Sequence, residues 1–93
     1  MRTILSIENT RAYVTAAIRR SINRWLTSTD TTRTALADRA GVAHIDMSRL
    51  MGDAYKPIKR GPALFTLVQV ALATGMSLDE LCGLDQLRER MGS

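Results

Sequence analysis

The chain has 93 residues, of which 45% are apolar and 4% aromatic, and its formal net charge is +4. This length allows one small domain, and with so few aromatic side chains the core must be aliphatic, which favours helices over a β-sandwich. The single cysteine cannot form an internal disulfide, and together with the single histidine it cannot supply a metal site. No apolar run approaches the roughly 18 residues of a membrane span, and no signal-peptide pattern opens the chain. We therefore expect a cytoplasmic protein without a cofactor.

The charge is unevenly distributed along the chain. Residues 1–30 and residues 31–62 each carry a net charge of +3, whereas residues 63–93 carry −2. A mixed charge can serve only to keep a small domain in solution. A segregated basic part is nevertheless a modest indication of a polyanionic partner.

The first periodic segment spans residues 9–27, where apolar residues recur every three or four positions. This spacing predicts an amphipathic helix, which ends in the polar run of residues 27–32. Its apolar residues are Val14, Ala17, Ile18, Ile22, Trp25 and Leu26. Its outer surface is expected to carry the arginines Arg11, Arg19, Arg20 and Arg24.

Two short helices are predicted next, over residues 33–40 and 44–51. Thr32 can cap the first with its side-chain oxygen, and Gly41 supplies the left-handed residue that ends it. In the second, Met47 and Leu50 are spaced to face the core. Two helices of this length joined by a tight glycine turn form a helix-turn-helix, over about residues 32–52.

A loop rich in Gly, Pro and basic residues follows at 52–61, and two closing helices are predicted within residues 62–90. Pro62 suits the first turn of one closing helix, and Gly75 ends it. Ser77 and Glu80 form a capping box at the start of the other, and Gly83 weakens its middle. The expected apolar stripes are Leu64, Leu67, Val68, Ala71 and Leu72 in the first, and Leu78, Leu81, Leu84 and Leu87 in the second.

Four motifs follow one another with fitting spacing across these helices. They are Leu36-Ala37-x-x-Ala40-Gly41-Val42, Met47-Ser48-Arg49-Leu50, Pro62-x-Leu64-x-x-Leu67 and Gly75-Met76-Ser77-Leu78-Asp79-Glu80-Leu81. In this order, residues 32–81 resemble the phage-repressor-like helix-turn-helix family, also called the XRE type. The resemblance implies an all-α, compact, five-helix lambda-repressor-like domain over residues 1–93.

In this family the second helix of the motif lies in the DNA major groove. The resemblance therefore implies base contacts by His44, Ile45, Ser48 and Arg49, of which Arg49 suits guanine. It implies phosphate contacts by Arg33, which stands where the family usually has Gln, and by the extended loop through Lys56, Lys59 and Arg60. The arginines of the first helix are weaker candidates for phosphate contacts.

Other roles remain open for the same side chains. Arg49 can be solvated or can pair with Asp46, and Ile45 can pack against Tyr55. The charges of the loop can simply be solvated. Asp46 stands where the family has small polar residues, and an ion pair within the helix is a better expectation for it than a base contact.

We therefore expect a sequence-specific transcriptional regulator, a repressor of phage, plasmid or mobile-element type that occupies an operator in double-stranded DNA. It is expected to act as a homodimer, with Leu81, Leu84 and Leu87 as the first candidate interface and the segment 4–7 as the second. Both segments can equally complete the core of one monomer.

The alternative is a protein-interaction module on a helix-turn-helix scaffold, such as an antitoxin or an anti-activator, since a fold does not dictate a function. Asp46, Ile45 and Met51 in the second helix of the motif favour it, as does the acidic last third. No enzyme is expected, because His44 and Cys82 lie on different elements. Cys82 is better explained as a small core residue.

Overall fold

The computed structural model describes residues 6–52 and 64–92. These residues form six helices and no strand, so the predicted all-α class is confirmed, although five helices were expected. The helices are α1 (Ile7–Thr29), α2 (Arg33–Ala40), α3 (His44–Met51), α4 (Leu64–Thr74), α5 (Leu78–Cys82) and α6 (Leu84–Gly92).

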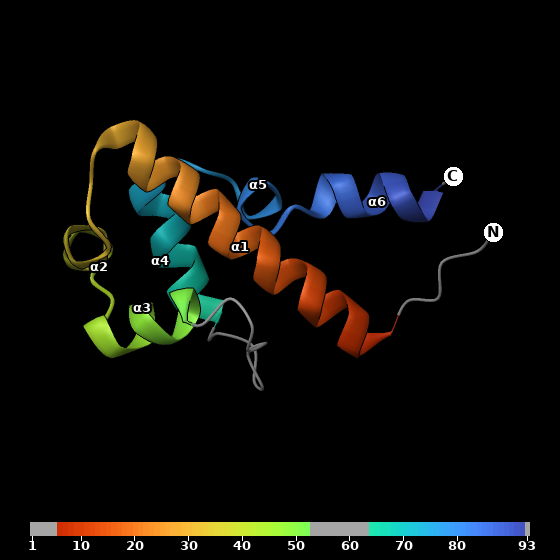
Figure 1. The fold of residues 1–93 in the computed structure, drawn as a ribbon, viewed down its shortest axis with the longest axis horizontal. Coiled ribbons are helices and arrows are strands. Elements are labelled where there is room, and N and C mark those ends of the chain that lie inside the picture. Colours follow the sequence, from red (N-terminus) through yellow and green to blue (C-terminus); the bar gives the residue numbers. More distant parts are fainter. Residues whose placement is uncertain (1–5, 53–63, 93) are drawn as a thin grey trace.

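The long helix α1 runs diagonally across the molecule, and the other helices are arranged around it (Figure 1). Ser6 caps the start of the helix, with its hydroxyl accepting from the Asn9 amide at 3.1 Å, and Asp30 caps its end in a left-handed conformation. Its buried face packs against α5 and α3. The predicted apolar face is confirmed in Ala17, Ile18, Ile22 and Leu26, which are buried, and in Val14 and Trp25, which pack against the core from the side.

The expectation that the arginines of α1 lie on its outer surface is wrong for Arg19. Its exposed fraction is only 9%, and its Nε donates a hydrogen bond to the carbonyl of Leu50 at 3.1 Å. Arg19 is buried because it lies on the same side of the helix as Thr15, four residues before it, and Ile22, three residues after it, which are both buried. Arg20 and Arg24 are exposed as expected.

In α4 the predicted inner face is partly wrong. Ala71 is buried and Leu67 packs against the core, but the most deeply buried residue of the helix is Val70, while Leu64 and Leu72 are exposed. The helix is apolar on almost every side, so its periodicity does not identify the face that packs inward. The helix contacts α2 and α5.

The last predicted helix is two helices, α5 and α6, because Gly83 adopts a left-handed conformation with φ of +65°. The predicted capping box is confirmed at the start of α5: the Ser77 hydroxyl accepts from the Glu80 amide, and a Glu80 carboxylate oxygen accepts from the Ser77 amide. The chain turns at Gly83, where an added Cβ would lie 2.9 Å from the Cβ of Ala17. A side chain at Gly83 would therefore push α5 away from α1.

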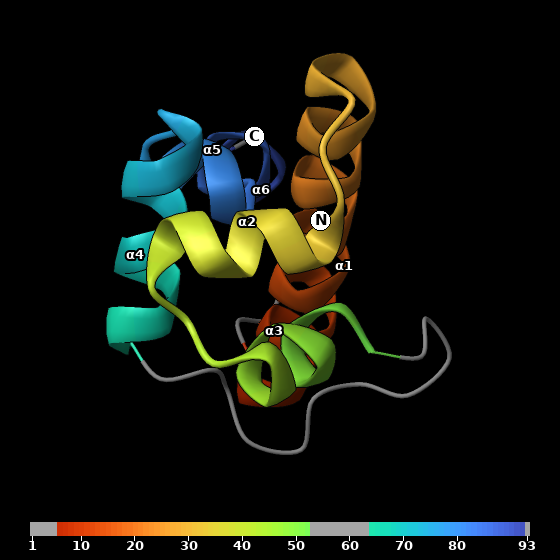
Figure 2. The same ribbon diagram turned by 90° about the vertical axis from the view of Figure 1, so that its left-hand side faces the viewer.

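The two ends of the molecule differ in how they are packed. Figure 1 shows α2 and α3 at one end and α6 at the other, and Figure 2 shows α2 crossing beside α3. The core joins α1 to α5 and has contributions from every helix except α6, which buries no residue. Tyr13 of α1 holds α6 in place: its hydroxyl donates to the Gly83 carbonyl at 3.2 Å, and its ring lies 5.4 Å from the Arg90 guanidinium.

Candidate nucleic-acid interface

The pair α2–α3 has the bounds that the sequence predicts, because each boundary is fixed locally. The Thr32 hydroxyl accepts from the Ala35 amide at 3.1 Å and so caps the start of α2. Gly41 ends α2 with φ of +69°, and the following Val42 amide donates to the Ala37 carbonyl at 2.9 Å. The chain then enters α3 through Ala43, which offers no side-chain cap. Two eight-residue helices joined by a glycine turn are thus present, as the sequence predicts.

One side of α3 is anchored in the core and the other faces solvent. Met47, Leu50 and Met51 are buried, which confirms the inward orientation predicted for the first two. The four residues with predicted base contacts all face outward: His44, Ile45, Ser48 and Arg49. Ile45 is 59% exposed, which is a large exposure for a β-branched apolar side chain.

The buried Arg19 of α1 holds the far end of α3. It binds the carbonyl of Leu50, one of the last carbonyls of α3, which have no partner within the helix. The positive guanidinium also suits the negative end of the helix dipole. Sequence reasoning missed this role because the two residues are 31 positions apart.

His44, the first residue of α3, contacts α2. Its Nε2 lies 2.7 Å from Oδ1 of Asp38, and both side chains are more than half exposed. The contact occupies Nε2 of the ring and leaves Nδ1 without a partner among the described residues. The contact fixes the imidazole at the junction of the two helices.

Residues from both helices of the motif come together around a shallow cavity of about 40 Å³. Its lining includes Arg33 and Thr34 from α2 together with His44 and Ser48 from α3. The structure therefore places the predicted phosphate-contact residue Arg33 beside two predicted base-contact residues. The other predicted phosphate contacts, Lys56, Lys59 and Arg60, lie outside the described residues, as does Tyr55.

Asp46 does not form the expected ion pair with Arg49. Among the described residues, neither side chain has a partner within ion-pair distance. Both are exposed on α3, so the Arg49 guanidinium keeps its hydrogen-bond donors available.

The predicted dimer interface is contradicted at one of its three positions. Leu81 has no exposed surface and belongs to the core, whereas Leu84 and Leu87 are half-buried. Leu81 lies on α5, which packs against α1, and the turn at Gly83 separates it from the two leucines of α6. Met51, which favoured a protein-binding role for α3, is also buried.

The one cysteine of the chain, Cys82, is buried in the core. Cys82 is a core residue, as expected, and burial, with Asp79 as the smaller cause, raises the pKa of its thiol. A raised pKa disfavours the reactive thiolate. In the described ranges, no three His, Cys, Asp or Glu side chains could hold a metal ion together, and no helix has the length and apolarity to cross a membrane.

Comparisons of the chain with protein families, with curated proteins and with solved structures found no match.

Proposed function

We propose that the protein is a sequence-specific DNA-binding regulator of transcription with a lambda-repressor-like fold, a repressor that occupies an operator with α3 in the major groove. The observation that carries the proposal is the solvent-facing surface of α3, with Arg33 of α2 at the same cavity. A rigid helix with one anchored side and one free side is what groove insertion requires.

The side chains on this surface match the chemistry of base edges and phosphates. Arg49 has no ion-pair partner among the described residues and can donate two hydrogen bonds to guanine O6 and N7. Ile45 can remove its exposed apolar surface from water against a thymine methyl group. Arg33 can bind a backbone phosphate at the start of α2.

A homodimer remains part of the proposal, with its interface moved to the residues of α6. Leu84 and Leu87 are half-buried, and α6 lies at the end of the molecule away from α3 (Figure 1). Pairing through α6 would leave the surface of α3 uncovered.

Arg49→Ala is expected to weaken binding to the operator by about 1–3 kcal/mol, roughly 5-fold to 150-fold, because a bidentate guanine contact is lost. Fluorescence polarisation against DNA from the protein's own promoter measures this change. Arg33→Ala is expected to weaken binding to all sequences and to lower the salt slope by about one. The matched control is Arg39→Ala, an exposed arginine of α2 that does not line the cavity shared by Arg33 and α3.

Two results would count against this function. One is the absence of any preference for promoter DNA over unrelated DNA of equal length. The other is full retention of affinity in the Arg33→Ala, Arg49→Ala double variant.

A second candidate function is a protein-interaction module, such as an antitoxin or an anti-activator. The outer side of α4 favours it, since Leu64, Phe65 and Leu72 are 63–77% exposed on one helix. This function would be supported by a protein partner that binds the wild type stoichiometrically and does not bind the Phe65→Ser variant. The wild type would also not be retained on DNA.

A further inference from the structure

Helix α4 reverses the usual placement of polar and apolar side chains on a surface helix. None of its eleven residues is charged. Two of its three polar side chains, Gln69 and Thr74, donate to backbone carbonyls of the same molecule, at 3.0 Å and 2.8 Å. Large apolar side chains face the solvent instead. Because a surface helix is normally polar on its outer side, this one is expected to have a partner there.

The apolar side chains form one stripe along the helix. Leu64, Phe65 and Leu72 are between 63% and 77% exposed. Val68 lies midway between the two leucines, four residues from each, and therefore on the same side of the helix. It is half-buried and, unlike Leu67, is not one of the described residues that pack against the core. The residues Leu64, Phe65, Val68 and Leu72 are called the outer face of α4 below.

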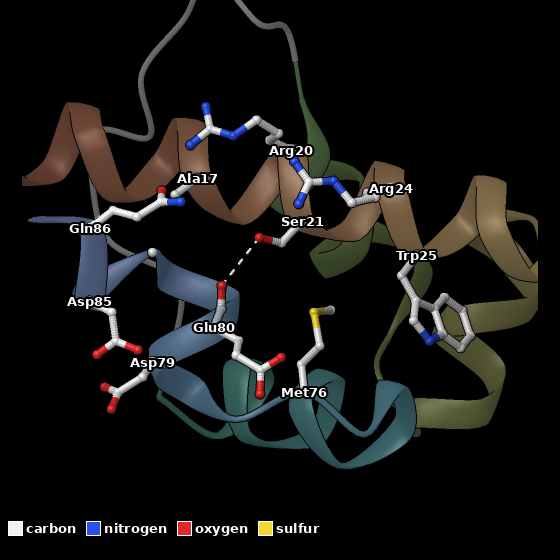
Figure 3. Close-up of a pocket in the computed structure, with 11 residues that line it drawn as sticks. Ala17, Arg20, Ser21, Arg24, Trp25, Met76, Asp79, Glu80, Asp85 and Gln86 are labelled. Atoms are coloured by element: carbon white, nitrogen blue, oxygen red, sulfur yellow. Dashed lines mark hydrogen bonds between the residues drawn. The ribbon is translucent and has the colours of Figure 1, made fainter.

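The opposite side of α4 is held by the rest of the molecule. The helix contacts α2 and α5, and α5 is tied to α1, where the Ser21 hydroxyl donates to the Glu80 carbonyl at 3.3 Å (Figure 3). Met76, which follows α4, packs against the core. Figure 2 shows α4 at the edge of the molecule, with α2 and α5 on one side of it. The outer face is thus presented on a fixed helix.

The size of the outer face determines how strongly it can bind. Exposed apolar patches that serve as binding sites measure about 300–600 Å², and these four side chains give a patch of about that order. A stable interface buries about 800 Å² from each partner. The outer face alone therefore suits weak association, with a dissociation constant on the order of 0.1 mM.

The charge of the chain and the order of the four residues both suit a second copy of the same face. Two copies with a net charge of +4 repel each other, but α4 adds no charge to the contact. In a two-fold contact, residue i meets residue j and j meets i. The stripe is symmetric about Val68, so two antiparallel copies would place Leu64 against Leu72 of the other copy. Val68 would then meet Val68 at the two-fold axis, where its small side chain lets the helices approach closely.

We propose that the outer face of α4 is a self-association surface that pairs, antiparallel, with the same face of a second copy of the chain. The face lies on a different helix from the pairing through α6. It needs no DNA, so the inference does not rest on the DNA-binding function.

A cysteine at the two-fold axis tests the geometry directly, since it meets its own copy within the reach of a disulfide. With oxidised glutathione as the oxidant, Val68→Cys is expected to form a covalent dimer at least about tenfold faster than Ala16→Cys. Ala16 is exposed on α1 and is the matched control. Cys82 is buried and is not expected to react.

A charge on the outer face tests the energetics. Leu72→Glu is expected to weaken this self-association by at least about tenfold, because an unpaired carboxylate would be buried against Leu64 of the other copy. Ala16→Glu adds the same charge elsewhere and is expected to have no such effect. Sedimentation equilibrium measures both variants, and any pairing through α6 is common to the two. Circular dichroism checks that the variants are folded.

Two results would overturn the proposal. The first is Val68→Cys dimerising no faster than Ala16→Cys, which would leave the outer face to a different protein. The second is equal self-association of Leu72→Glu and Ala16→Glu. Dimerisation of Leu64→Cys faster than that of Val68→Cys would contradict the antiparallel geometry. No DNA is present in these measurements, so their failure would leave the DNA-binding proposal standing.

Discussion

Leu81→Ala is expected to lower the free energy of unfolding by about 2–5 kcal/mol, the usual effect of emptying a fully buried leucine site. The side chain has no exposed surface and lies where α5 packs against α1 and α4. For a chain of this length, that loss is a large share of a total stability of about 5–15 kcal/mol. Urea titration followed by circular dichroism measures it.

Leu72→Ala is the matched control, because Leu72 is 74% exposed on α4. The control is expected to lose less than about 1 kcal/mol. A core role for Leu81 makes its loss independent of protein concentration. If the difference in free energy of unfolding between Leu81→Ala and the wild type instead grew with protein concentration, Leu81 would be an interface residue. Its assignment to the core would then be wrong.

Arg19→Met is expected to lower the free energy of unfolding by about 1.5–3 kcal/mol, the range for a lost hydrogen bond from a charged group. Methionine retains much of the apolar stem of the arginine, so the loss reports on the polar contacts of the guanidinium, which include the bond to the Leu50 carbonyl. That bond holds the end of α3. The same variant is therefore also expected to weaken any activity that depends on the position of α3.

Arg20→Met is the matched control for this prediction. Arg20 is the exposed neighbour of Arg19, and its substitution is expected to change stability by no more than about 0.5 kcal/mol. Urea titration of both variants separates a buried structural arginine from a surface one. Equal losses in the two variants would contradict the structural role given to Arg19.

The sequence predicts α2 and α3 well, because their boundaries depend on neighbouring residues. Thr32 and Gly41 determine the ends of α2 through contacts within a few positions. The outward side of α3 was predictable for the same reason, since the spacing of Met47 and Leu50 marks its inner side.

The features that the sequence did not predict depend on distant contacts or on ambiguous patterns. Arg19 binds Leu50 across 31 positions, and only its helical phase next to Thr15 and Ile22 could have indicated burial. The inner side of α4 was ambiguous because the helix is apolar on most sides. The packing of α1 against α5 joins residues near position 20 to residues near position 80, such as Ser21 and Glu80, which no local pattern relates.

Because of how α6 is attached, its backbone is expected to open at a lower free energy than the backbone of α1. A nine-residue helix is too short to be stable alone in water, and the described residues support α6 through Tyr13, the ion pair of Arg88 with Asp79 of α5, and the half-buried Leu84 and Leu87. Its amide hydrogens should therefore exchange with solvent through a local unwinding of low free energy, while those of α1 exchange only when the core opens. Gly83 marks the boundary between these two classes of amides.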